Sequence, residues 1–262
     1  MDARAVLAVF DEQIRRHPTA DAPGERVEHD EAVVRLVAGE GGRSTVTWSE
    51  LEETAADAVI AATIERFALL RVGEWEWKHY SYDRPADLPR RLLAAGFTPE
   101  PAEALMVAEI AELALDVPPP VGVELRPVTD QQGVDALVRV HNEVFGEDHS
   151  AFGRHLLARL GRHPPRVAAV VAVAGDTPIS AGRVELHRGT EFASLWGGGT
   201  LPAWRGRGVF RSLVAYRAAL ASTEGFRYLQ VDASPESRPI LHRVGFVQLA
   251  TTTPFIWPAA SA

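Results

Sequence analysis

The sequence predicts an α+β protein built from two domains, and three observations support this. Its 262 residues exceed what one small domain needs and fall short of three. Three prolines at 118–120 can continue neither a helix nor a strand ladder, so we expect domains at 1–117 and 118–262. After the prolines, strand and helix patterns alternate around one expected central sheet. The alternative, a rigid connector inside one larger fold, stays open at this point.

Composition excludes several classes of protein. With 27 Lys and Arg against 35 Asp and Glu, the net charge of −8 argues against a nucleic-acid partner. The chain has no cysteine, so disulfides, thiolate nucleophiles and Cys-ligated metals are excluded. The N-terminus lacks the pattern of a signal peptide, and the longest apolar run, 167–174, is far shorter than the roughly 20 residues of a membrane helix. We therefore expect a cytoplasmic protein with no membrane partner.

In the first half, hydrophobic spacing predicts short strands and amphipathic helices. Ser49 and Glu52 have the spacing of a capping box, which predicts a helix running from there to residue 68. Gly96 is expected to end a second helix. The predicted elements are a helix at 2–16, strands at 31–38, 44–48 and 75–82, a helix at 85–95, and a strand at 104–113.

In the second half, the order of predicted elements is sharper. It comprises a strand at 123–128, helices at 131–145 and 150–160, and strands at 166–173, 179–187 and 191–200. A turn, a helix to about residue 224, a strand at 227–231, a helix at 237–244 and strands within 246–257 follow. This order indicates an α+β domain with a central sheet.

The turn before the helix that ends near residue 224 has the character of an anion site. It reads Arg-Gly-Arg-Gly-Val-Phe-Arg over 205–211, so glycines can turn N–H groups toward one point at a helix N-terminus. An exposed turn with solubilising arginines is the plain alternative. A nicotinamide dinucleotide site, with Asp232 holding a ribose, is another, although Arg211 occupies its third glycine position.

Residues 123–257 resemble the GNAT N-acetyltransferases, whose acyl-CoA loop reads [RQ]-x-x-G-x-[GA]. Residues 205–210 match that loop at Arg205 and Gly208, and Phe210 departs from it where a small residue is usual. The segment 241–246, ending Gly-Phe, is similar to the family's last helix-strand junction. The resemblance implies a GNAT-like acyl-CoA-binding fold with a central, mostly antiparallel sheet.

The same resemblance implies acetyl-CoA as co-substrate, with no metal. Its pyrophosphate would meet the N–H groups of the loop, and its pantetheine arm would follow the end of the preceding strand. The implied residues are Gly199, Thr200, Leu201, Arg205, Gly206, Arg207, Gly208, Val209, Phe210 and Arg211, and Ser234 and Ser237 are further candidates. Three consecutive glycines at 197–199 permit a bulge or a close ligand approach, and tight sheet packing without a ligand is the alternative.

The sequence offers two candidates for the catalytic base. Glu185 and His187 lie two residues apart on one strand and share a face, so either could serve as the base. Leu241 stands where the family often has a proton-donating Tyr. We expect transfer of an acetyl or other acyl group to an amine of a small molecule or peptide, by a monomer or homodimer. The alternative is an acyl-CoA-binding or regulatory module without catalysis.

The first half contains a possible second copy of the fold. Residues 72–113 repeat the strand, helix, Gly-Phe and strand order of 228–257, with Gly96-Phe97 matching Gly245-Phe246. The first half lacks the glycine loop. We therefore expect a tandem arrangement in which the degenerate N-terminal copy binds no CoA.

Overall fold

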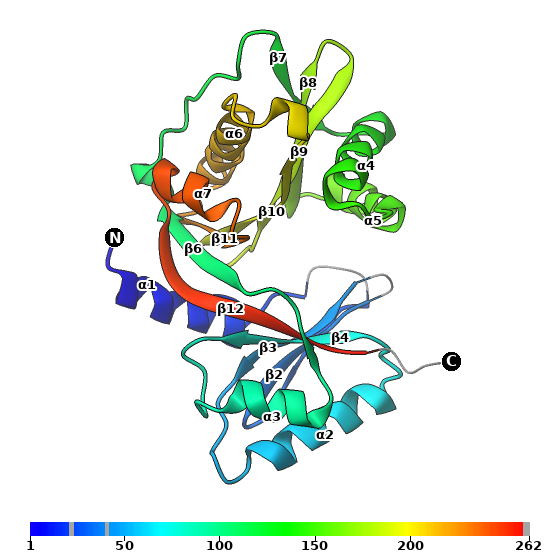
Figure 1. Ribbon diagram of the computed structural model, residues 1–262, viewed down its shortest axis with the longest axis vertical. Helices are drawn as coiled ribbons and strands as arrows, with labels where there is room; N and C mark the ends of the chain where they lie inside the picture. The colour runs from blue at the N-terminus through cyan, green and yellow to red at the C-terminus, as the bar shows by residue number, and fades with distance from the viewer. Residues whose placement is uncertain (21–23, 40–41, 259–262) are drawn as a thin grey trace. The chain divides into compact units, whose positions relative to one another are not determined.

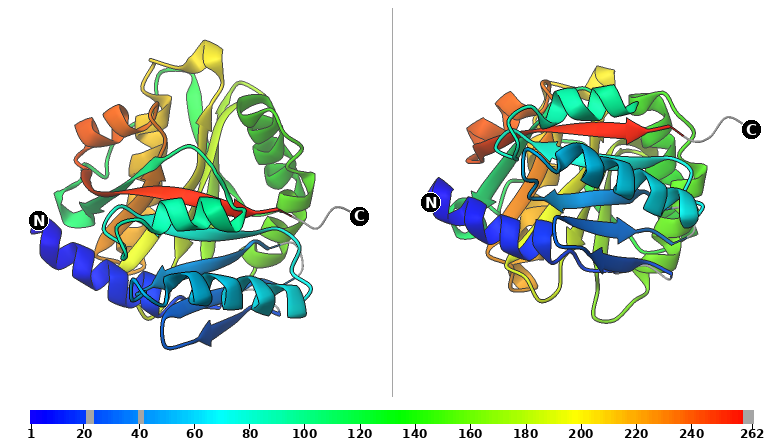
Figure 2. Two further views of the ribbon diagram at one scale, coloured as in Figure 1. Left: turned by 60° about the horizontal axis from the view of Figure 1, so that its bottom comes forward. Right: turned by 90° about the horizontal axis from the view of Figure 1, so that it is seen from below.

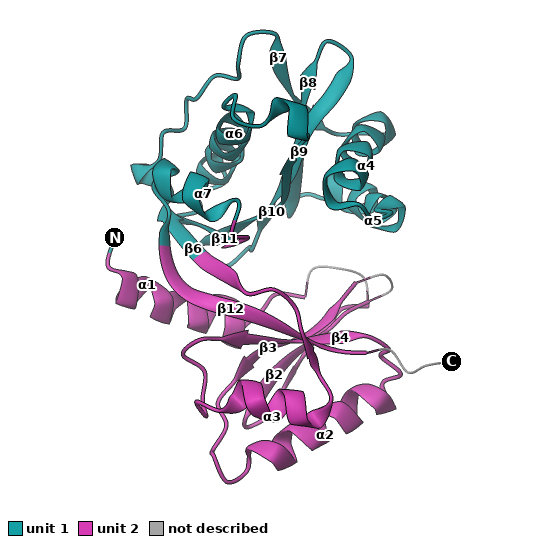
Figure 3. Ribbon diagram, in the orientation of Figure 1, with its two compact units in different colours: residues 1, 106–231, 236–247 teal, residues 2–105, 232–235, 248–262 magenta. Residues whose placement is uncertain are grey.

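The computed structural model describes residues 1–20, 24–39 and 42–258, which form two compact units (Figure 3). Unit 1 contains residues 1, 106–231 and 236–247, and unit 2 contains 2–105, 232–235 and 248–262. Unit 2 thus takes its last strand, β12 (Val247–Trp257), almost entirely from the C-terminal end of the chain. Most of β6 (Glu103–Glu109) goes to unit 1. The boundary between the units is therefore not a single point after residue 117. Most of β6, from the first half of the chain, belongs to unit 1, and most of β12, from the second half, belongs to unit 2.

Unit 2 combines a mixed sheet with an N-terminal helix and two covering helices. Besides β12, it contains α1 (Ala3–Phe10), the π-helix η1 (Asp11–Arg16), β1 (Arg26–His29), β2 (Val33–Val37), β3 (Ser44–Ser49), α2 (Ala56–Leu69), β4 (Trp75–Tyr80), α3 (Leu88–Ala95) and β5 (Thr98–Pro99). The pairs β1–β2, β2–β3 and β4–β12 are antiparallel. The pair β3–β4 is parallel, so its strands need the crossover that α2 provides.

The core of unit 2 lies between its sheet and α2 and α3, which cover one face of the strands (Figure 2). Trp75 and Trp77 are two residues apart on β4 and therefore point to the same face, where both are buried. Phe67 of α2 and Leu92 of α3 belong to the same cluster. Helix α3 ends as predicted at Gly96, whose φ of +109° is the left-handed cap that glycine favours.

Unit 1 is built on a mostly antiparallel sheet. Its elements are β6, η2 (Ile110–Glu112), β7 (Val123–Val128), α4 (Gln131–Phe145), α5 (Ser150–Leu160), β8 (Val167–Ala174), β9 (Thr177–Leu186), β10 (Phe192–Thr200), η3 (Pro202–Trp204), α6 (Val209–Thr223), most of β11 (Tyr228–Ala233), and α7 (Arg238–Val244). Strands β7 to β10 pair antiparallel in chain order. Strands β10 and β11 pair parallel, and α6 connects them. Unit 1 is thus α+β, as predicted.

Helices cover both faces of the unit 1 sheet (Figure 1). Val167, Ala169 and Val171 of β8 pack in one cluster with α4 and α5. Val170 and Ala172, which alternate with them, pack with α6 on the other face. No helix among the described residues is long and apolar enough to cross a membrane.

The predicted segments at 123–128, 131–145 and 150–160 have the bounds of β7, α4 and α5. The predicted cap at Ser49 is wrong. Ser49 is the last residue of β3, pairs with Val33 across the sheet and is buried, whereas α2 begins only at Ala56. Strand pairing therefore overrides the local capping pattern. The sequence reading also missed the short strands β1 and β5, and residues 247–257 form one strand.

Candidate functional site

The turn between β10 and α6 has the geometry of an anion-binding loop. Gly206 and Gly208 have φ values of +72° and +89°, and a Cβ on either would meet nothing within 4 Å. Gly208 is the N-cap of α6, where no side chain caps the helix and no acidic residue lies in the first turn. The first N–H groups of a helix have no partner within the helix, and its N-terminus carries a partial positive charge. The loop therefore presents backbone donors to an anion.

The three arginines of the loop are exposed and differ in orientation. Arg205 turns back, and its Nε donates to the Thr200 carbonyl at 3.0 Å. Arg207 lies over the Trp204 ring, 4.9 Å from its centroid. Arg211, in the first turn of α6, makes no ion pair within the described residues. Arg205 thus ties the loop to the end of β10, while Arg207 and Arg211 supply positive charge at the rim.

Strand β10 carries a bulge just before this loop. Trp196 pairs with Arg183 and Gly199 pairs with Ala181, so Gly197 and Gly198 together face the single Gly182. Gly197 has a φ of +57°, which favours glycine. On its other edge, β10 pairs with β11 only over 192–194. The bulge therefore lies where β10 has no register partner on either side.

Side chains from both faces fill the space beside these glycines. A Cβ on Gly197 would lie 2.7 Å from His141 Cε1, and one on Gly198 would lie 3.1 Å from Phe210 Cε2. A Cβ on Gly199 would lie 2.9 Å from Val144 Cγ1. The neighbouring side chains thus leave little or no room for a Cβ at any of the three glycines. Phe210, which departs from the family motif, lies against the bulge itself.

The remaining strand-end candidates are held by backbone and hydroxyl contacts. The Gly199 carbonyl accepts from Ser180 Oγ at 2.6 Å, and Thr200 Oγ1 lies 2.8 Å from the same hydroxyl. The Leu201 N–H donates to the Ile179 carbonyl at 2.9 Å. Val209 is buried in the core. These residues fix the path of β10 into the loop.

Glu185 is the centre of an arginine cluster. Its carboxylate accepts from Arg159 Nη2 at 3.0 Å and from Arg183 Nε at 2.9 Å. Burial alone would raise the pKa of Glu185, but the charges of Arg183 and Arg159 outweigh it and lower the pKa to about 2. A carboxylate with so low a pKa is a weak proton acceptor, so its arrangement is that of a counter-ion.

His187 follows the end of β9 and contacts β10. Its Nε2 lies 2.7 Å from Ser194 Oγ, which also accepts from Trp196 Nε1 at 2.8 Å. Ser194 is buried, whereas the Trp196 side chain is 40% exposed. The imidazole is therefore linked through one hydroxyl to an exposed aromatic residue two positions from the bulge.

The candidates after β11 lie in different units. Ser237 occupies the N-cap position of α7 in unit 1, and Ser234 belongs by its contacts to unit 2. Leu241, at the position where the family often has Tyr, is only 1% exposed. The structure supplies no proton donor from that position.

Two residues that contact the bulge or the strand facing it are not among the predicted site residues. The His141 imidazole on α4 lies with Nε2 2.8 Å from the Gly197 carbonyl oxygen, and Arg217 on α6 donates from Nη1 to the Arg183 carbonyl at 3.1 Å. Both are buried. Each sits within an otherwise apolar helical stripe, with Leu137 and Val144 around His141 and with Leu213, Val214 and Ala221 around Arg217. A polar residue in such a stripe was the available signal.

The nicotinamide alternative does not fit the observed geometry. It requires parallel neighbours on both sides of the strand before the glycine turn, whereas β10 is parallel to β11 on one side and antiparallel to β9 on the other. It also assigns the Asp232 carboxylate to a ribose. In unit 2 this carboxylate is buried and accepts from Lys78 Nζ at 2.5 Å.

Comparisons with known proteins show the fold. No protein-family model matches the chain, and no curated protein matches it. A GCN5-related N-acetyltransferase from Kribbella flavida matches with a TM-score of 0.68 and 17% identity, covering 99% of this chain and 95% of its own. A GCN5-related N-acetyltransferase from Sphaerobacter thermophilus matches with a TM-score of 0.60 and 15% identity, covering 99% and 94%. A tandem GNAT protein from the clavulanic acid biosynthesis pathway matches at 0.61 and 13%, covering 88% and 79%. The chain therefore has the GNAT fold.

Proposed function

We propose that unit 1 is an acyl-CoA-dependent N-acyltransferase that transfers an acetyl group, or another acyl group, from CoA to an amine of a small molecule or peptide. The observation that carries this proposal is the 205–211 loop. Two glycines with positive φ precede a helix N-terminus that no side chain caps, and the exposed Arg207 and Arg211 flank it. This combination suits the pyrophosphate of CoA.

The residues present fit acetyl-CoA as a co-substrate. The N–H groups of residues 206–211 would hold the pyrophosphate, with Arg207 and Arg211 supplying charge. The bulge of β10 would meet the acyl end of the arm. In the reaction, an uncharged amine attacks the thioester carbonyl, the new C–N bond forms and the C–S bond breaks. The nitrogen gives up one proton to a base or to water, and the leaving thiolate takes up one proton. Since the leaving thiolate is stable, positioning and backbone polarisation supply most of the catalysis.

The arrangement assigns different roles to the two catalytic candidates. Glu185 holds Arg183 and Arg159 in place, because a carboxylate with a pKa of about 2 gains a proton only weakly. His187 is the better candidate for the base, since a neutral imidazole has a ring nitrogen that can accept a proton. A His187→Gln variant that kept full turnover would remove it from this role.

A thermal-shift titration tests the proposal most simply. Acetyl-CoA at about 100 times its Kd should stabilise the protein by roughly 2.7 kcal/mol, whereas NAD and ATP should not. Gly208→Asp places a negative charge in the loop and should abolish the shift. Gly225→Asp is the matched control, because Gly225 follows the other end of α6, has a φ of +84° and also faces open space. No shift by any CoA compound in the wild type would end the proposal.

Two observations favour a second function, acyl-CoA binding without turnover. Phe210 lies against the bulge, and the buried Leu241 offers no proton. Release of free thiol from acetyl-CoA across a panel of amines separates the two functions. Tight binding with no thiol release would favour the binding module.

We also propose that the N-terminal domain, residues 1–117, is a degenerate copy of the domain formed by residues 118–262. Most of the first domain lies in unit 2 and most of the second in unit 1. Helices α3 and α7 each have Pro at the start and end in a left-handed glycine, Gly96 or Gly245. In both, the next residue is a buried Phe whose N–H bonds the carbonyl five residues earlier. The parallel pairs β3–β4 and β10–β11 each extend over three residues. A CoA-binding site found in unit 2 would contradict this proposal.

A further inference from the structure

The bulge of β10 is held from both faces of the unit 1 sheet. On one face, His141 Nε2 lies 2.8 Å from the Gly197 carbonyl oxygen. Because a carbonyl oxygen only accepts, Nε2 must carry the proton. Burial lowers the pKa of His141 to about 4, so the imidazole is neutral through the physiological range. His141 is thus a fixed, uncharged donor to the first residue of the bulge.

On the other face, Arg217 reaches the strand opposite the bulge. Its Nε donates to the Leu213 carbonyl and its Nη1 to the Arg183 carbonyl, both at 3.1 Å. A Cβ on Gly182 would lie 2.7 Å from Nη1, and one on Gly198 would lie 3.4 Å from Nη2. The guanidinium therefore occupies the space that these two glycines leave.

Arg217 is a buried charged residue, and burying its charge is expected to lower the stability of the fold. It is 1% exposed, and no carboxylate among the described residues forms an ion pair with it. Burial and the nearby charge of Arg183 lower its pKa to about 9, so it remains charged at neutral pH. A buried unpaired charge is destabilising, and an apolar residue of similar volume is often better tolerated. Stability alone does not explain this arginine.

The two contacts have a consequence for the peptide between Gly197 and Gly198. Because that peptide is planar and trans, its N–H points away from its C=O. A donor on the Gly197 carbonyl therefore directs the Gly198 N–H away from His141, and it polarises this N–H into a stronger donor. Gly198 has no register partner on β9, and β10 pairs with β11 only over 192–194.

We propose that His141 and Arg217 are positioning residues that hold the β10 bulge so that the Gly198 N–H can donate to the acyl thioester. The role rests on the acyl-CoA site proposed above. His141 orients and polarises the peptide, and Arg217 fixes the facing segment of β9. Neither side chain contacts the reacting atoms.

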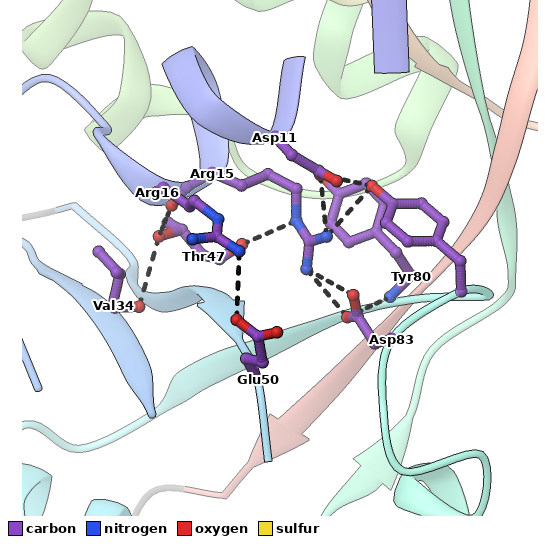
Figure 4. A network of polar contacts seen from close by, with 9 residues as sticks. Asp11, Arg15, Arg16, Val34, Thr47, Glu50, Tyr80 and Asp83 are labelled. Atoms are coloured by element: carbon purple, nitrogen blue, oxygen red, sulfur yellow. Dashed lines mark hydrogen bonds and ion pairs between the residues drawn. The ribbon is translucent and has the colours of Figure 1, made fainter. Parts of the chain in front are cut away.

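In unit 2 a buried arginine also contacts a bulged pair of strands, but it donates to the bulged strand β3 itself (Figure 4). Val34 pairs with Trp48 and Arg35 with Val46, so Thr47 of β3 is an extra residue. The buried Arg15 donates from Nε to the Thr47 carbonyl at 3.1 Å. This arginine is neutralised by Asp83 and Asp11, unlike Arg217. The buried charge of Arg15 is thus offset by two carboxylates, whereas no carboxylate in the part of the chain that the structure describes offsets that of Arg217.

The test compares His141→Gln, which keeps an amide donor near the position of Nε2, with His141→Leu, which removes it. Selective ¹⁵N-glycine labelling gives the Gly198 amide signal. We expect an upfield proton shift in His141→Leu and recovery in His141→Gln. We also expect turnover of acetyl-CoA to fall about 10-fold in His141→Leu, with the Kd for CoA itself unchanged within twofold. An unchanged Gly198 signal and turnover in His141→Leu would overturn the proposal.

Arg217→Met provides a second variant that separates positioning from folding. We expect its Tm to stay equal or rise, because a buried charge is removed, while acetyl-CoA turnover falls at least fivefold. Equal or greater stability with full turnover would overturn the role of Arg217. If the wild type neither binds nor turns over acetyl-CoA, the proposed function fails. The Gly198 signal of His141→Leu then still reports whether the contact orients the peptide.

Discussion

The crossovers α2 and α6 share one topology but differ in the residues before each helix. Each connects a parallel pair of strands, and each follows a strand with a bulge. The segment before α6 has Gly206 and Gly208 and exposed arginines. The segment before α2 has Glu52 and Glu53 and no glycine, and Asp57 lies in the first turn of the helix.

These differences change what each helix N-terminus can bind. Carboxylates beside α2 already interact favourably with its positive end and would repel a polyanion. The loop before α6 leaves its backbone donors to a ligand. On the function proposed above, the glycines and the sign of the charge at the crossover, rather than the topology, distinguish the α6 loop from the segment before α2.

The largest effect is expected at the bulge of unit 2. Arg15→Met leaves the buried Asp83 without its arginine partner and removes the Arg15 donor of the Thr47 carbonyl, so the free energy of unfolding should fall by about 3–5 kcal/mol. Denaturant unfolding measures this loss. Arg16→Met, which removes an exposed pair with Glu50, should cost a small fraction of it. Since we place no ligand in unit 2, the Kd for acetyl-CoA should stay unchanged, and a large rise in Kd would contradict the comparison.

A second effect concerns Glu185, the counter-ion in unit 1. Its folded pKa of about 2 lies below its ordinary 4.5, so its stabilisation is full above pH 4.5 and is lost as the pH falls toward 2. Glu185→Gln should lower the free energy of unfolding at pH 7 by about 2–3 kcal/mol. Urea titrations of both proteins at pH 7 and pH 3 should show the difference shrinking at the lower pH. A difference independent of pH would contradict the ion-pair assignment.

A smaller effect is expected from reversing charges at the crossovers. Arg211→Glu should raise the Kd for acetyl-CoA about 10-fold, or about 1.4 kcal/mol, with a larger change at low salt. The matched reversal at the other crossover, Glu53→Arg, should leave binding unchanged, because that turn has no glycines. Fluorescence or calorimetric titration measures both. An equal change in the Kd for acetyl-CoA in the two variants would contradict the claim that only the crossover at α6 binds CoA.

The smallest effect concerns Glu103 in unit 2. Burial, together with the charges of Asp232 and Glu76, raises the pKa of Glu103 to about 7 from 4.5. Such a group holds its proton in the folded state, so the free energy of unfolding falls as the pH rises from 4.5 to 7. Glu103→Gln should therefore be more stable than the wild type at pH 8, by on the order of 1 kcal/mol, and equal to it near pH 4. Glu65→Gln, on the exposed side of α2, should show no such pH-dependent gain.

Local patterns predicted elements well where the elements are locally determined. Helices α4 and α5 carry clear apolar stripes, and Gly96 and Gly245 mark helix ends that only a left-handed residue suits. The Ser49 cap failed because a strand partner, Val33, decides its backbone. The exchange of β6 and β12 between units could not be predicted, because it depends on pairing between distant segments.

The local features of the candidate site could be predicted from the sequence, and its long-range contacts could not. The glycine loop was predicted, because a turn at the start of a helix is a local feature. The ion pairs of Glu185 were not, because Arg159 lies on a separate helix. The contacts of His141 and Arg217 with carbonyls of distant strands were not predictable either, because they depend on how each helix packs on the sheet.

Calorimetric titration of the full chain with acetyl-CoA tests the central claim most directly, because it counts sites. We predict one site per chain in the wild type and in Gly225→Asp, and none in Gly208→Asp. Two sites per chain, or one site that survives in Gly208→Asp, would place binding outside the 205–211 loop and would contradict the distinction between the two units.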